Sequence, residues 1–115
     1  MKSPITTHVL DTALGKPAAG VHVVLQFWQA GRDWTPLAEG LTNEDGRILD
    51  WMPAGAVLTP GTYRVMFDTR GYFERQKLAA FFPCVPIMFE VRDPKQHYHI
   101  PLLLSPYGYS TYRGS

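Results

Sequence analysis

Apolar and polar residues alternate in several short stretches of the chain, and this alternation predicts β-strands. In residues 4–11 (PITTHVLD), Ile5 and Val9 share one face, because successive side chains of a strand point to opposite sides. Residues 62–68 (TYRVMFD) alternate in the same way, and residues 97–104 (HYHIPLLL) form the longest such stretch. Each of these strands can therefore bury one face in a core.

The remaining pattern adds further strands and a single helix. Strands are expected at 21–28, 34–39, 86–91 and 109–113, separated by segments rich in Gly and Pro. Residues 71–80 (GYFERQKLAA) predict a short helix, ended by the Phe-Phe-Pro that follows. Seven or eight short strands with one short helix are typical of an all-β fold, a two-sheet antiparallel β-sandwich.

Two histidines are expected on the outer face of their strands. If Tyr98 and Ile100 face the core, His99 and Leu103 face outward, and the same alternation places His8 outward on the first strand. An outer face that is half apolar is typical of an oligomer interface or of a pocket lining.

Length, charge and cysteine content narrow the class of protein. The 115 residues fit a single domain spanning residues 1–115, with a modest core that oligomerisation would help. A net charge of +1 gives no indication of a nucleic-acid or membrane partner. One cysteine excludes a disulfide framework, and the start of the chain does not resemble a signal peptide. We therefore expect a cytoplasmic protein; a removed periplasmic signal peptide or a peroxisomal location is the alternative.

Several residues could carry chemistry, and each also has a purely structural interpretation. His8, His97 and His99 could together supply three imidazoles to a metal, but no carboxylate or thiol is expected on their face, so no metal site is predicted. His97 is expected at the solvent-exposed mouth of its strand. Cys84 is expected to be a small buried side chain. His22 has no charged neighbour in its strand and is expected to be structural.

Three segments carry a resemblance to a known family. Residues 5–21 (ITTHVLDTALGKPAAGV) and 98–115 (YHIPLLLSPYGYSTYRGS) resemble the two signatures of the 5-hydroxyisourate hydrolases, the transthyretin-related enzymes of urate breakdown. The NEDGR sequence at 43–47 extends the resemblance over essentially the whole chain. The resemblance implies a transthyretin-like sandwich that assembles as a homotetramer, a dimer of dimers, with its sites in a channel between dimers.

The resemblance also implies roles for individual residues. His8, Arg47 and His99 match the catalytic residues of the family. The substrate-binding set would comprise His8, Arg47 and the terminal Tyr112, Arg113, Gly114 and Ser115. The implied reaction opens the six-membered ring of 5-hydroxyisourate without a cofactor.

The residue types suit such a hydrolysis. A neutral imidazole can take a proton from water near pH 7, and a guanidinium offers a planar fork to adjacent oxygens. Whether His8 or His99 is the base stays open at this point. Two other classes of function also stay open: a transthyretin-like carrier of a small aromatic ligand without catalysis, and a domain whose outer leucines and tyrosines only bind a partner.

Overall fold

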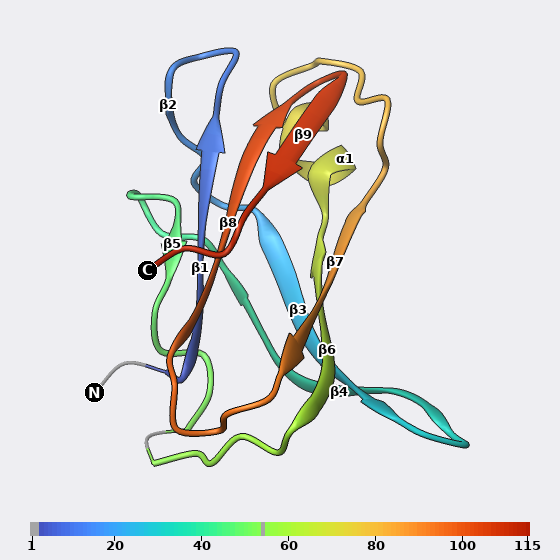
Figure 1. Cartoon of the computed structure of the whole chain (residues 1–115). Helices are drawn as coiled ribbons and strands as arrows, with labels where there is room; N and C mark the ends of the chain where they lie inside the picture. The colour runs from blue at the N-terminus through green and yellow to red at the C-terminus, as the bar shows by residue number, and fades with distance from the viewer. Residues whose placement is uncertain (1–2, 54) are drawn as a thin grey trace.

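The computed structural model describes residues 3–53 and 55–115, which form nine strands and one helix in two stacked sheets (Figure 1). The strands are β1 (Ile5–Asp11), β2 (Lys16–Pro17), β3 (His22–Gln29), β4 (Asp33–Leu41), β5 (Arg47–Ile48), β6 (Gly61–Phe67), β7 (Val85–Val91), β8 (Tyr98–Ser105) and β9 (Gly108–Thr111). The helix is α1 (Thr69–Glu74). One sheet runs β2-β1-β8-β9, with β5 also paired to β1, and the other runs β4-β3-β6-β7. The predicted two-sheet β-sandwich is confirmed.

The core lies between the sheets and is built from the predicted faces. Ile5 and Val9 of β1 are fully buried, and Tyr63, Val65 and Phe67 of β6 are at most 2% exposed. The apolar face of β8 is buried as well: Tyr98, Ile100, Leu102 and Leu104. Burying these side chains is the main favourable contribution to the fold.

The sequence pattern predicted an antiparallel sandwich, but one pair of neighbouring strands is parallel. β1 and β8 are parallel neighbours, with Thr6 opposite His99 and His8 opposite Pro101. Parallel strands need a long crossover, and here the chain between them builds the whole second sheet before it returns. This register brings the two outward-facing histidine strands side by side.

The helix begins earlier and is shorter than the predicted 71–80. Asp68 caps it, because its Oδ1 accepts a hydrogen bond from the Gly71 backbone N–H at 3.0 Å. After Glu74 the backbone tightens into turns, and Lys77 has a positive φ of 59° that no helix can contain. The predicted helix extended too far because Ala80 is apolar, yet Ala80, like Phe82, packs on the core from a loop.

Two smaller predictions were wrong. Lys16–Pro17, expected to lie between strands, pairs with the end of β1 as β2. Cys84 is exposed, because it lies just before β7 begins its buried alternation. His22 has no charged neighbour within β3, as expected, and the pairing of β3 with β4 sets its Nε2 2.9 Å from Glu39 Oε2. Pro36 lies in the edge strand β4, where a missing backbone donor is tolerated.

No helix within residues 3–53 and 55–115 has the length and apolar character needed to cross a bilayer.

Candidate active site

Arg47 is held beside His8 by a tight turn. Asn43 Oδ1 accepts hydrogen bonds from the backbone N–H groups of Asp45 (2.9 Å) and Arg47 (3.0 Å), which closes the turn. Gly46 has a φ of 74°, and its carbonyl accepts from the Val9 N–H at 2.7 Å. A Cβ at this position would collide with the Val9 carbonyl oxygen. Glycine therefore lets β5 lie against β1 with Arg47 directly opposite His8.

His99 reaches the same region from β8. Its Nδ1 lies 2.8 Å from Oγ1 of Thr6, the residue that faces it across the parallel pair. The imidazole rings of His8 and His99 have centroids 6.5 Å apart and planes tilted by 36°. The side chains of β1, β5 and β8 thus converge although Thr6 and His99 are 93 positions apart in the sequence.

The segment after β9 turns back across β8 toward β1 and β5 (Figure 1). The Gly114 N–H donates to the His99 carbonyl at 2.9 Å. A Cβ on Gly114 would lie 2.5 Å from His99 Cδ2 and 3.1 Å from Pro101 Cγ. Only a residue without a side chain fits over the imidazole here, and this close fit brings Ser115 to the histidines.

These residues border a small polar pocket of about 190 Å³. Its lining consists of Thr6, Arg47, Leu49, His97, His99 and Ser115. His8 adjoins it through its ring contact with His99 and its pairing with Arg47. A guanidinium, imidazoles and hydroxyls around one small volume can bind a planar molecule rich in oxygen and nitrogen.

The surroundings of His8 favour its neutral form. Burial lowers the pKa of His8 below the ordinary 6.5, and the positive charge of Arg47 lowers it further. A backbone hydrogen bond with Asp45 and the carboxylate of Asp45 oppose this shift without reversing it. At neutral pH the imidazole of His8 is therefore ready to accept a proton rather than to donate one.

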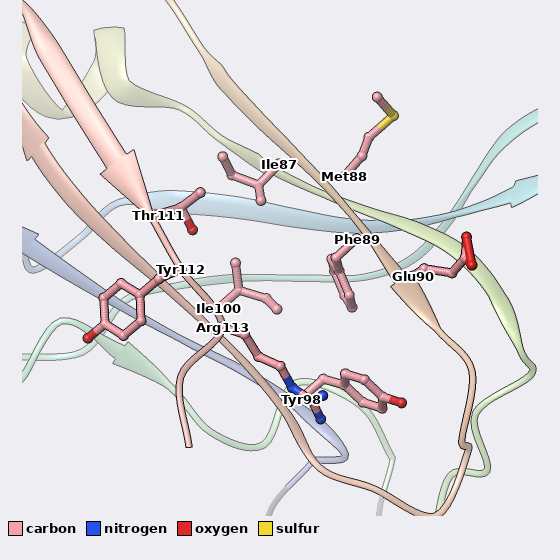
Figure 2. Close-up of a pocket in the computed structure, with 9 residues that line it drawn as sticks. All are labelled: Ile87, Met88, Phe89, Glu90, Tyr98, Ile100, Thr111, Tyr112 and Arg113. Carbon is pink, nitrogen blue, oxygen red and sulfur yellow. The ribbon is translucent and has the colours of Figure 1, made fainter.

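The four residues of the YRGS ending go to two different places. Ser115 lines the small polar pocket and Gly114 packs on His99, whereas Tyr112 and Arg113 line a second pocket, of about 250 Å³, between β7 and the β8–β9 pair. Figure 2 shows the Arg113 side chain directed at Tyr98 while Tyr112 points away from both. The Arg113 guanidinium carbon lies 4.6 Å from the Tyr98 ring centroid, and Nη2 donates to Gln96 Oε1 at 2.9 Å. Within one chain, Arg113 therefore holds the terminal segment against Tyr98 and Gln96.

Three pocket residues were not predicted: Thr6, Leu49 and His97, of which His97 had been assigned to solvent. His97 is exposed, but its Nε2 lies 2.9 Å from Thr6 Oγ1. Thr6 is two residues from His8 on β1, so the alternation of a strand places both side chains on the same face. This shared face is the one signal in the sequence that could have indicated Thr6 as a pocket residue. Its partners follow from the β1–β8 register, which no local pattern contains.

The described residues, 3–53 and 55–115, contain no group of three or more His, Cys, Asp or Glu side chains placed to hold a metal ion. The three imidazoles considered as metal ligands from the sequence do not form such a group.

Comparison with known proteins agrees with this geometry. The sequence model of the HIUase/Transthyretin family matches residues 5–114. The chain belongs to this family. Among curated relatives, a 5-hydroxyisourate hydrolase of Salmonella typhimurium is 51% identical over 96% of this chain and 80% of its own length. One from Mus musculus is 43% identical over 98% of this chain and 96% of its own length.

Solved structures of two kinds of family member share the fold. The 5-hydroxyisourate hydrolase of Klebsiella pneumoniae matches with a TM-score of 0.82 and 37% identity, covering 96% of this chain and 92% of its own. Sea bream transthyretin, solved in complex with thyroxine, matches with a TM-score of 0.89 and 32% identity, covering 97% and 95%. The fold alone therefore does not distinguish catalysis from ligand binding, and the function has to be argued from the side chains of the candidate site.

Proposed function

We propose that this protein is a 5-hydroxyisourate hydrolase of urate breakdown, which opens the six-membered ring of its substrate to give 2-oxo-4-hydroxy-4-carboxy-5-ureidoimidazoline. The observation that carries the proposal is the convergence of His8, Arg47 and His99 from three strands around one polar pocket. Curated relatives that bear the hydrolase name match nearly the whole chain and support the same substrate.

In the proposed reaction a neutral imidazole, of His8 or His99, removes a proton from the attacking water. The lowered pKa of His8 and the hydrogen-bonded ring of His99 both suit this role. Arg47 binds the substrate through adjacent oxygens and stabilises the charge that develops on the attacked carbonyl. Its position is preset, because the turn at Gly46 holds its backbone before any substrate arrives. Gly114 and Ser115 close the pocket wall over His99.

The assembly we propose is a homotetramer, a dimer of dimers. In the single chain, β7 and β9 are edge strands, and exposed Met88 and Tyr112 border the pocket between them (Figure 2). Edge strands of this kind readily pair with another chain. The outer face of β1 and β8, with half-buried Leu10 and Leu103 beside the histidines, would then meet its copy across a channel. A cytoplasmic location completes the proposal, in keeping with a single, unpaired cysteine.

The decisive experiment supplies freshly generated 5-hydroxyisourate to the purified protein and follows the decay of its absorbance. We expect decay far above the spontaneous rate, and a loss of about 10²-fold or more in His99→Gln, the scale of general acid–base assistance. His22→Gln is the matched control, because His22 lies on the other sheet, paired with Glu39. Decay at the spontaneous rate, together with tight retention of an aromatic ligand, would instead identify a carrier.

A further inference from the structure

One hydroxyl group lies between two imidazoles at the candidate site. Thr6 Oγ1 is 2.9 Å from His97 Nε2 and 2.8 Å from His99 Nδ1. Thr6 is 1% exposed, His99 is half-buried, and His97 is exposed to solvent. All three side chains line the same polar pocket, with the Thr6 hydroxyl buried between the rings and His97 the most exposed of the three.

A hydroxyl carries one proton, so Thr6 can donate to only one of the two ring nitrogens, and where it does so it accepts from the other. If Thr6 donates to His97 Nε2, it accepts from His99 Nδ1–H, and the proton of neutral His99 is then on Nδ1. Nε2 of His99 then carries the lone pair that a base needs. In the reverse arrangement, His97 Nε2–H donates to Thr6, Thr6 donates to His99 Nδ1, and neutral His99 holds its proton on Nε2.

We propose that Thr6 couples His97 to His99 as a proton path, and that His99 is the base of the proposed hydrolysis. His99 Nε2 takes a proton from water as the water oxygen bonds to the substrate carbonyl carbon and the carbonyl π electrons move to its oxygen, whose negative charge Arg47 stabilises. When those electrons return and the ring C–N bond breaks, the leaving nitrogen takes up a proton from water. The Nδ1 proton of His99 passes to Thr6 Oγ1, and the proton already on Thr6 passes to His97 Nε2. Thr6 ends as a hydroxyl again, His99 ends neutral, and the positive charge lies on His97, whose side chain is exposed in the single chain and can pass a proton to water.

This assignment rests on the proposed function for its chemistry but on the two hydrogen bonds for its geometry. It chooses between the two histidines because a Thr6 contact is found for His99, whereas His8 faces Arg47 and Pro101 across its strand pairs. His8 is then left to orient the water or the substrate from its position beside Arg47. Thr6 and His97 are positioning residues, since they act through His99.

The first test needs no substrate. Nitrogen-15 NMR of ring-labelled histidines at neutral pH reports which nitrogen of each imidazole carries the proton. We expect His99 protonated on Nδ1 and His97 unprotonated on Nε2 in the wild type, with both assignments kept in Thr6→Ser and lost in Thr6→Val. Thr7→Val is the matched control, because Thr7 is an equally buried neighbour whose hydroxyl donates to the Ile100 carbonyl. The opposite tautomers in the wild type, or wild-type tautomers in Thr6→Val, would overturn the proposal.

The second test is kinetic. We expect Thr6→Val to lower kcat by about 10²-fold, Thr6→Ser to restore it to within about threefold, and His97→Gln to lower it comparably to Thr6→Val. Wild-type kcat in Thr6→Val or in His97→Gln would rule out the path. If the wild type itself does not hydrolyse 5-hydroxyisourate, the proposed function fails while the NMR result still decides whether Thr6 sets the two tautomers.

Discussion

Replacing Gly114 with alanine should damage the site without damaging the fold. Gly114 has no positive φ, so its backbone accepts an alanine. The new Cβ, however, would lie 2.5 Å from His99 Cδ2 and 3.2 Å from His99 Cγ. Ordinary carbon contacts begin near 3.5 Å, so the imidazole or the terminal segment must move by about 1 Å.

The size of the effect follows from that displacement. A misplacement of about 1 Å at a reacting group can cost about 10²-fold in rate. The His99 ring cannot yield freely, because Nδ1 is hydrogen-bonded to Thr6 and Pro101 lies 3.1 Å from the same Cβ. We therefore expect kcat/KM in Gly114→Ala to fall by about 10²-fold while the melting temperature changes by no more than a few degrees.

The assay compares Gly114→Ala with Gly108→Ala on freshly generated 5-hydroxyisourate, alongside thermal unfolding of both variants. Gly108 is a matched control, because an added Cβ there would meet only Ser105 Oγ, at 3.7 Å. Wild-type kcat/KM in Gly114→Ala would refute the claim that the terminal segment fixes His99. An equal loss in both variants would show that the change disturbs β9 in general.

Three further predictions follow from other contacts. Arg47→Lys should lower kcat/KM by about 10²-fold despite the retained charge, since the planar fork is lost; full activity would exclude the fork as the binding element. Because the folded pKa of His8 lies below its unfolded value, the unfolded chain binds the proton more readily, so the free energy of unfolding should fall as the pH drops below about 6.5. Urea titrations across this pH range should show that the free energy of unfolding falls less in His8→Gln than in the wild type. An equal fall in both proteins would contradict the lowered pKa of His8. Tyr72→Phe removes a 2.7 Å hydrogen bond to buried Asp11 and should cost about 2 kcal/mol in the same titrations with kcat/KM unchanged; a loss of activity would mean that this contact also shapes the site.

The strands and their buried faces could be predicted because apolar and polar residues alternate along each strand, and this alternation is visible in the sequence. Ile5, Val9 and Ile100 were each predicted on a face that the structure buries. The parallel pairing of β1 with β8 could not be predicted, because strand order depends on packing over the whole chain. The helix boundary was misplaced for a related reason: Ala80 and Phe82 are apolar because they pack on the core from a loop, not because the helix continues to them.

The residues of the candidate site also fall into those that the sequence could predict and those that it could not. His8, Arg47 and His99 stand in motifs that resemble a family and that the structure brings together, although their catalytic roles stay predictions. Thr6 was missed because a threonine in a strand has no distinctive pattern until its partner is known. Arg113 was expected in the same pocket wall as Ser115, but its stacking on Tyr98 turns it to the second pocket in the single chain.

The parallel contact between β1 and β8 has a consequence for synthesis. A ribosome makes β1 early, yet its partner strand emerges only after both edge strands of the opposite sheet. Until then the edge of β1 that pairs with β8 has no partner strand, a situation that slows folding and invites association. Activity in a nascent chain would therefore report that synthesis has passed β8 and that this strand has paired with β1.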